Sequence, residues 1–182
     1  MSRPGENDQE LAKRARGGDD QAFEKLVRLY QKKIYGFLLR LSGSEEDAME
    51  LTQATFVKSW MAIRSFRGES SFRTFLYTVA ANSWRNILRD RSRRHSVNLE
   101  DIPLASGQNP HEEVEKSQRR KKLWSAIGNL PQRQQEVVLL RIREGLPFDE
   151  AAEVMGCSLG AAKASYHQAV KRLTVELREK RP

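Results

Sequence analysis

The chain is 182 residues long, enough for one or two small domains, and it contains a single cysteine, Cys157. One cysteine excludes an internal disulfide framework and a cysteine-based zinc site. Because no apolar run approaches the ~20 residues needed to span a bilayer, and residues 1–18 are too polar for a secretory signal, we expect a cytoplasmic protein without membrane insertion.

The net charge of +8 is unevenly distributed along the chain. Residues 1–95 hold 18 Lys and Arg against 12 Asp and Glu, and residues 116–182 hold 14 against 7. Residues 96–115 between them hold five acidic residues and no Lys or Arg. Two basic blocks on an acidic connector are typical of two modules that bind a polyanion.

The first strong helix pattern follows a polar segment, residues 1–18, whose start is expected to fray. After Asp20, a plausible cap, apolar residues recur at three- and four-residue steps as far as Leu41. This spacing predicts an amphipathic helix with one buried face. Ser42-Gly43 ends it.

Ser44, with Asp47 three residues later, forms a variant of the capping box and predicts the start of a second helix. The acidic residues after Ser44 suit a helix N-terminus. This helix is expected to run to about Ile63, and residues 66–68 form a break.

A third helix is expected from about Ser71, and it mixes aromatic residues with arginines. Seven of the chain's 14 aromatic residues lie between positions 56 and 84, and most of them should belong to the core. The predicted buried stripe consists of Phe72, Phe75, Leu76, Val79, Ala80, Ile87 and Leu88. Tyr77 and Trp84 are expected near its border with the arginine side, where rings can stack on the bases of a single strand.

Helix signals vanish over residues 96–110, which contain prolines and a glycine and read as a flexible acidic linker. A fourth helix is expected over residues 111–128, and another begins at Leu130-Pro131 and ends at Gly145. No segment reads as a strand. We therefore predict an all-α fold of two small helical domains, residues 1–95 and 111–182.

Residues 147–173 read as a helix-turn-helix. Ala151 and Ala152 allow close helix crossing, Gly156 breaks the first helix, and Ser158 is placed to cap the second. The second helix carries a hydrogen-bonding and cationic set suited to base edges and phosphates: Lys163, Ser165, His167, Gln168, Lys171 and Arg172. By itself this pattern also fits an ordinary antiparallel helix pair with a solvated face.

In this order, the parts resemble a bacterial RNA polymerase sigma factor of the extracytoplasmic-function group. ELTQATFVKSWMAIRSFRG at residues 50–68 resembles the family's second conserved region, and the run at residues 70–94 resembles the helix that reads and melts the −10 element. LPQRQQEVVLLRIREGLPFDEAAEVMGCSLGAAKASYHQAVKRL at residues 130–173 resembles the fourth region, which holds the −35 element in the major groove. Two separated matches in the right order are more specific than either alone.

The resemblance implies partners and residue roles. The expected partners are core RNA polymerase, promoter DNA as duplex and as non-template single strand, and an anti-sigma factor. No cofactor, metal or catalytic residue is expected, because strand separation can be driven by binding the single strand more tightly than the duplex. The polymerase contacts would be Glu50, Leu51, Gln53 and Phe56, although simple burial would explain Leu51 and Phe56 equally well.

The same resemblance assigns the third helix and the recognition helix to DNA. Phosphate contacts in the −10 region would come from Arg67, Arg73, Arg85 and Arg89, and an extruded base would be held by Asn82, Asn86, Tyr77 and Trp84. The −35 contacts would come from Lys163, Ser165, His167, Gln168, Lys171 and Arg172.

The chain departs from the family pattern at several positions. Ala54 replaces a glutamate, which weakens one expected polar contact to the polymerase, and Ser165 and Gln168 replace arginines in the recognition helix. The −35 preference therefore cannot be copied from relatives. Pro147 replaces a capping serine, so Asp149 is the expected alternative cap.

Two other classes of function fit parts of this pattern. A stand-alone helix-turn-helix repressor or activator would leave the aromatic and arginine-rich helix unexplained and would bind a palindromic site by itself. An enzyme acting on nucleic acid would need a metal cluster or a nucleophile with its base, and the three histidines, His95, His111 and His167, are scattered.

Overall fold

The computed structural model describes residues 4–94 and 122–179, and the chain divides into two compact units, Met1–Asn98 and Leu99–Pro182. These described residues form helices and helical turns without any strand, which confirms the predicted all-α class. The predicted linker, residues 96–110, and the first part of the predicted fourth helix lie outside them. Within the described ranges, no helix is long and apolar enough to cross a membrane.

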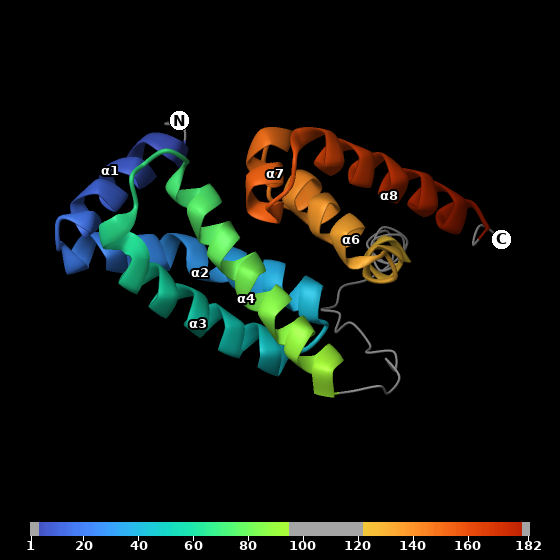
Figure 1. Ribbon diagram of the computed structural model, residues 1–182, viewed down its shortest axis with the longest axis horizontal. Coiled ribbons are helices and arrows are strands. Elements are labelled where there is room, and N and C mark those ends of the chain that lie inside the picture. The colour runs from blue at the N-terminus through green and yellow to red at the C-terminus, as the bar shows by residue number, and fades with distance from the viewer. Residues whose placement is uncertain (1–3, 95–121, 180–182) are drawn as a thin grey trace, which may run out of the picture. The chain divides into compact units, whose positions relative to one another are not determined.

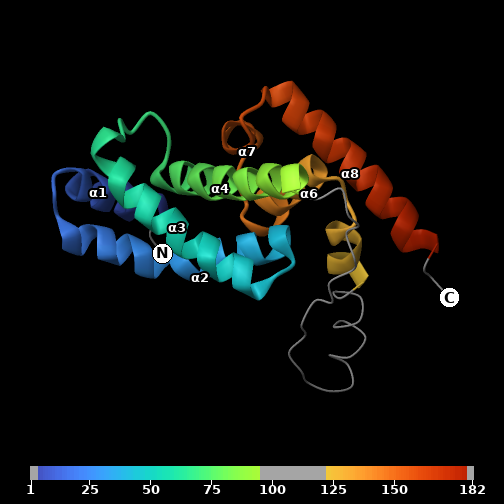
Figure 2. The same cartoon turned by 60° about the horizontal axis from the view of Figure 1, so that its bottom comes forward.

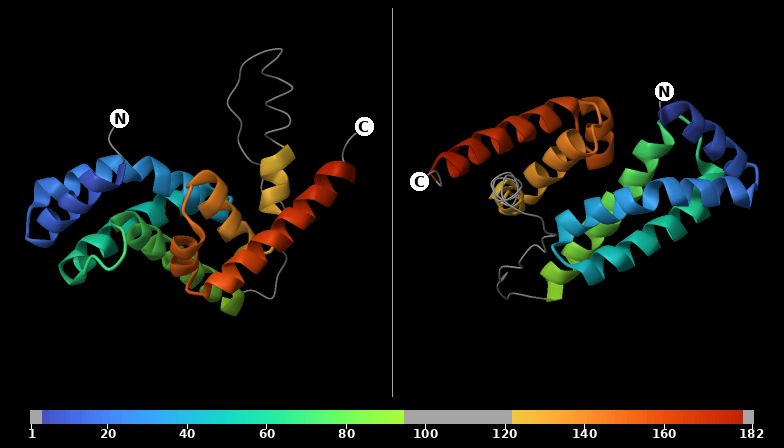
Figure 3. Two further views of the ribbon diagram at one scale, coloured as in Figure 1. Left: turned by 90° about the horizontal axis from the view of Figure 1, so that it is seen from above. Right: turned by 180° about the vertical axis from the view of Figure 1, so that it is seen from behind.

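The described part of unit 1 contains four α-helices and one 3-10 turn. They are α1 (Pro4–Arg16), α2 (Asp20–Ser42), α3 (Glu45–Ala62), η1 (Ile63–Ser65) and α4 (Phe72–Arg94). Figures 1 and 3 show α2 and α3 lying side by side with α4 running across both. The largest side chains with no exposed surface come from α2 and α4: Leu26, Ile34, Phe37, Leu38, Phe72, Leu76 and Tyr77.

Local chemistry sets both ends of α2. The cap is Asp19 rather than Asp20: its carboxylate accepts a hydrogen bond from the backbone N–H of Ala22 at 3.0 Å. That bond, together with the guanidinium of Arg14, lowers the pKa of the Asp19 carboxyl below its ordinary value. At the other end Gly43 has a φ of +68°, a left-handed conformation that favours glycine.

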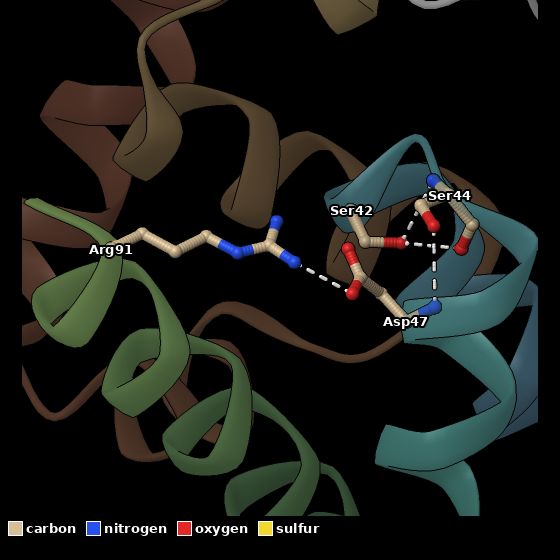
Figure 4. Close-up of polar contacts among 4 residues, drawn as sticks. All are labelled: Ser42, Ser44, Asp47 and Arg91. Carbon is tan, nitrogen blue, oxygen red and sulfur yellow. Dashed lines mark hydrogen bonds and ion pairs between the residues drawn. The ribbon is translucent and has the colours of Figure 1, made fainter. Parts of the chain in front are cut away.

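The capping box predicted at the start of α3 is only half formed. The Ser44 hydroxyl accepts a hydrogen bond from the backbone N–H of Asp47, as expected, at 3.2 Å. The N–H of Ser44 itself donates to the hydroxyl of Ser42, so the carboxylate of Asp47 is not needed there. It instead accepts from the guanidinium of Arg91 near the end of α4, at 2.6 Å (Figure 4). Asp47, which was expected to complete the cap of α3, thus links α3 to α4.

Helix α1 lies within the polar segment at residues 1–18, where no helix was predicted. Leu11, Ala12 and Ala15 are buried, and α1 packs against α2, α4 and η1. Two of these three residues are alanines, so their spacing produces only a weak hydrophobic pattern. Residues 1–3, where fraying was expected, lie outside the described residues.

The described part of unit 2 begins with a helical segment at residues 122–128. It continues with α6 (Gln132–Val138), the π-helical turn η2 (Leu139–Arg143), α7 (Phe148–Met155) and α8 (Leu159–Glu179). α8 packs against both α6 and α7 (Figure 2). The core contains residues of the helical segment after Pro131, together with residues of the helix-turn-helix: Val137, Val138, Leu140, Leu146, Ala151, Val154, Ala162 and Ala169.

The turn between α7 and α8 follows the sequence prediction closely. Gly156 ends α7 with a φ of +61°, and the hydroxyl of Ser158 accepts from the backbone N–H of Ala161 at 3.2 Å. At the start of α7, however, the expectation for Asp149 is wrong. Pro147 occupies the cap position without a side-chain hydrogen bond, and Asp149 lies inside the first turn. Its carboxylate there can favour the helix only through the dipole.

Candidate nucleic-acid interface

The outer face of α8 collects most of the residues predicted to contact duplex DNA. Its inner face is formed by Ala162, Ala169 and Leu173, which are buried against α6 and α7. Because successive residues are 100° apart, positions four residues apart lie along one stripe. Among the predicted set, the half-buried residue is Ser165, and the exposed residues are Lys163, His167, Gln168, Lys171 and Arg172.

Aromatic contacts fix the inner side of α8 to α7. The ring of Tyr166 meets the ring of Phe148 edge to face, with centroids 5.3 Å apart. The guanidinium of Arg141 lies 4.3 Å from the centroid of the same Phe148 ring and donates to the backbone carbonyl of Leu146. Arg141 therefore holds the turn before α7, the helix against which α8 packs.

The predicted DNA contacts on α4 differ in exposure. Asn82, Asn86 and Arg89 are exposed, whereas Arg73 and Arg85 are half-buried. Arg85 donates to the amide oxygen of Asn82 at 2.7 Å, and Arg89 donates to that of Asn86. Each arginine thereby engages the acceptor end of an asparagine three residues before it. The amide N–H groups of both asparagines can then donate to an approaching strand.

The prediction that Tyr77 and Trp84 lie at an accessible border of α4 is wrong. Tyr77 has no exposed surface and meets Phe37 of α2 with ring centroids 5.2 Å apart, while Trp84 is only 5% exposed. In their place, four residues of the predicted buried stripe are half-buried: Phe75, Val79, Ile87 and Leu88. The buried arc of α4 is thus rotated around the helix, because α1, α2 and α3 all pack against it. Neither ring can stack on a base without leaving the core.

Arg67 lies in the segment between η1 and α4, and α1 holds both ends of that segment. The guanidinium of Arg16 donates to the carbonyl of Phe66 at 3.4 Å. The amide of Gln9 donates to the carbonyl of Ser70 at 3.2 Å and accepts from the N–H of Phe72, the first residue of α4, at 3.1 Å. Three hydrogen bonds from α1 therefore position the segment that carries Arg67.

The four predicted polymerase contacts on α3 divide by burial. Glu50 and Gln53 are exposed, Phe56 is half-buried, and Leu51 is only 3% exposed and belongs to the core. Sequence reasoning missed three exposed apolar residues at four-residue steps around Gln53: Met49, Val57 and Met61, which are 58%, 59% and 76% exposed. Such an exposed apolar stripe is a candidate surface for binding another protein. The sequence shows these residues as apolar positions of α3 that lie on a different side of the helix from the buried residues.

Among the described residues, no group of three or more His, Cys, Asp and Glu side chains is arranged to hold a metal ion. Of the three histidines, His167 is exposed on α8, and His95 and His111 lie outside the described residues.

Two family descriptions match the chain, one in each unit. Residues 26–94 match Sigma-70 region 2, and residues 120–173 match Sigma-70, region 4. The chain is 34% identical to the ECF RNA polymerase sigma-E factor of Haemophilus influenzae over 89% of its own length and 90% of that protein. It is 33% identical to the RNA polymerase sigma-H factor of Pseudomonas aeruginosa over 90% of both, and 31% identical to the ECF RNA polymerase sigma-E factor of Escherichia coli K12 over 89% of this chain and 90% of that one.

Solved structures resemble the fold at lower identity. CnrH in complex with the cytosolic domain of CnrY superposes with a TM-score of 0.73 at 24% identity, covering 97% of this chain and 100% of that one. The sigma factor RpoE of Bartonella quintana, in complex with the anti-sigma factor NepR, gives 0.74 at 24% identity, covering 87% and 98%. These likenesses support the all-helical fold described above.

Proposed function

Because the chain belongs to the sigma-70 family of RNA polymerase sigma factors, in its extracytoplasmic-function group, we propose a division of labour between its two units. The protein directs promoter-specific initiation of transcription by RNA polymerase. In our proposal, unit 1 binds core polymerase and the −10 element, and unit 2 binds the −35 element. The observation that carries the proposal is the polar outer face of α8, with three exposed cationic residues, Lys163, Lys171 and Arg172.

In unit 2, α8 enters the major groove of the −35 element. Lys163, His167 and Gln168 are exposed and can reach base edges, with Ser165 beside them at the edge of the packed side. Lys171 and Arg172 follow one turn later and contact phosphates, which fixes the register of the helix on the duplex.

In unit 1, α4 and the segment before it hold the non-template strand. Arg67, Arg73, Arg85 and Arg89 contact phosphates, and the amides of Asn82 and Asn86 contact an extruded base, with Tyr77 and Trp84 supporting α4 from the core. Strand separation follows from tighter binding of the single strand than of the duplex. The protein is a DNA-binding initiation factor, and we propose that its own residues catalyse no chemical step.

The polymerase surface lies on α3. We assign it to Glu50 and Gln53 together with the apolar stripe of Met49, Val57 and Met61, while Phe56 contributes its exposed part and Leu51 holds the helix from inside. Polar residues that flank exposed apolar ones are typical of a protein–protein contact. Ala54 is half-buried, so the missing glutamate at that position removes a polar group from the margin of this surface.

We also propose that the protein works in the cytoplasm, with core polymerase, and that an anti-sigma factor binds it. The support comes from the two solved complexes above, in which CnrH holds the cytosolic domain of CnrY and the Bartonella protein holds NepR.

Transcription with purified core polymerase tests the division of labour. Lys163→Ala should weaken binding to a −35 duplex and leave transcription from a premelted template unchanged, because the premelted template needs only unit 1. Arg178→Ala, in the last turn of the same helix, is the matched control for loss of one charge. If both templates suffer equally, or if the protein binds a palindrome without polymerase, the proposed roles are wrong.

The polymerase surface has a separate test. Gln53→Ala combined with Glu50→Lys should leave helicity intact and weaken binding to core polymerase in a calorimetric titration, because both side chains are exposed. Glu10→Lys on α1, also an exposed charge reversal, is the control. Unchanged affinity in the double variant would contradict the assignment of α3.

A further inference from the structure

A buried amide on α6 holds an exposed amide on the recognition helix. Gln134 is 7% exposed and donates its Nε2 to Oε1 of Gln168 on α8, with the two atoms 3.2 Å apart. Its own Oε1 is buried and has no hydrogen-bond partner among the described residues. Gln168, by contrast, is exposed. The bond therefore joins the interior of unit 2 to the surface proposed to face DNA.

α6 is itself fixed against α8, so this bond is anchored at its inner end. Val137 and Val138, one turn after Gln134, are fully or almost fully buried, and α6 packs along α8. A second link joins the side chain of Asn129, before α6, to Glu176 of α8, with Nδ2 and Oε1 3.4 Å apart. Gln134 thus restrains a long side chain that would otherwise sample many rotamers.

The restraint decides which hydrogen-bonding groups Gln168 can offer. A free glutamine amide can rotate to present either its oxygen, as acceptor, or its NH₂, as donor. With Oε1 held on the α6 side, the two N–H groups of Gln168 are left to point outward. In the major groove guanine presents two acceptors, N7 and O6, whereas the paired contact of glutamine to adenine needs the amide oxygen to accept from N6. The held amide therefore matches guanine better than adenine.

We propose that Gln134 is a specificity-determining positioning residue: by holding Oε1 of Gln168 it makes that amide a donor and selects guanine over adenine at one base pair of the −35 element. This inference rests on the proposed function of unit 2. It also gives a role to the glutamine that replaces an arginine at position 168. The same bond would be a mere packing contact if Gln168 touched only phosphate or solvent.

The test measures base preference with the full chain and core polymerase. A duplex library randomised over the −35 element is bound and sequenced, first with the wild-type protein and then with Gln134→Met, which keeps an unbranched side chain of similar length and removes the donor. Gln134→Asn is the second variant, because its amide is one methylene too short to reach Gln168. Gln132→Met, exposed two residues earlier on α6, is the control.

We expect both Gln134 variants to lower the guanine-to-adenine ratio at a single base pair by about tenfold, the size of one good base contact. Gln168→Ala should abolish the preference at that same pair, and adding Gln134→Met to it should change nothing further, because the two residues act as one unit. Gln132→Met should keep the wild-type profile.

Two results would overturn the inference. The base profile of the Gln134 variants could stay unchanged, or their affinity could fall by one factor for every sequence, as expected for packing or for a phosphate contact. A wild-type protein without preference at any −35 position would overturn the proposed function of unit 2, and the inference with it. The two failures are therefore distinguishable.

Discussion

α4 and α8 are both long helices that contain basic and aromatic residues. They differ in how many of these side chains are exposed to solvent. α4 packs against α1, α2 and α3, and both aromatic residues once expected at its surface, Tyr77 and Trp84, are in the core. α8 packs against α6 and α7 and leaves most of its polar residues exposed. The number of neighbouring helices, more than the composition of a helix, therefore decides which side chains remain available for a ligand.

The difference also bears on how each helix can read DNA. In the proposed role, α8 offers a broad row of exposed side chains to a groove of duplex DNA. Of the residues of α4 predicted to contact DNA, Asn82, Asn86 and Arg89 are exposed, and Arg85 and Arg89 each donate to an asparagine three residues before it. A helix fixed on three sides holds such groups in place, which favours gripping a few nucleotides of a separated strand.

The largest expected effect compares one tyrosine from each helix. Tyr77→Ala should lower the free energy of unfolding of unit 1 by about 3–5 kcal/mol, because it empties a fully buried ring site. Tyr166→Ala in α8 should cost unit 2 only about 1 kcal/mol, since that ring is half-buried and packs against the ring of Phe148 at the surface of the unit. Denaturant titration followed by amide hydrogen exchange reports the two units separately.

Asn82→Ala, at an exposed position of α4, is the control and should change stability by less than about 0.5 kcal/mol. Equal costs for the two tyrosines would mean that α4 and α8 are covered to the same extent. A stable Tyr77→Ala protein that no longer opens duplex promoters would return Tyr77 to the DNA contact set.

A smaller effect is expected where α1 supports the start of α4. Gln9→Ala removes one hydrogen bond to the carbonyl of Ser70 and one from the N–H of Phe72, and should destabilise the first turn of α4 by about 1 kcal/mol. Hydrogen exchange should become faster in that turn and in the segment that carries Arg67. Glu10→Ala, the exposed neighbour on α1, should leave both rates unchanged. Uniformly faster exchange throughout unit 1 would show a general loss of stability instead of a local support.

The smallest effect concerns the other end of α4, at the ion pair between Asp47 and Arg91 (Figure 4). The side chain of Arg91 is 54% exposed, so the pair is screened by water and Asp47→Asn should cost only about 0.2–1 kcal/mol. A double-mutant cycle with Arg91→Ala measures the coupling, which should shrink in high salt. Asp90→Asn, at an exposed position of α4 beside Arg91, is the matched control. Coupling that persists in high salt would show that the pair is less accessible to water than the 54% exposure of the Arg91 side chain indicates.

Much of the local structure was determined by the sequence itself. The left-handed glycines Gly43 and Gly156 end α2 and α7, and the hydroxyls of Ser44 and Ser158 cap α3 and α8, as their positions in the sequence predicted. Each of these signals acts between residues at most four positions apart. A short stretch of sequence is therefore enough to predict it. The all-α class and the order of the two motifs follow from the same kind of local information.

Only the tertiary structure decided which face of each helix is buried and which side chains pair across helices. It turned Tyr77 and Trp84 inward, joined Asp47 to Arg91 instead of completing a capping box, and placed Gln134 against Gln168. It also brought α1 against the segment before α4 and left an apolar stripe exposed on α3. The physical reason is that burial depends on how many helices from distant parts of the chain surround a residue, and a helical pattern shows which residues share a face without showing how wide the covered arc is.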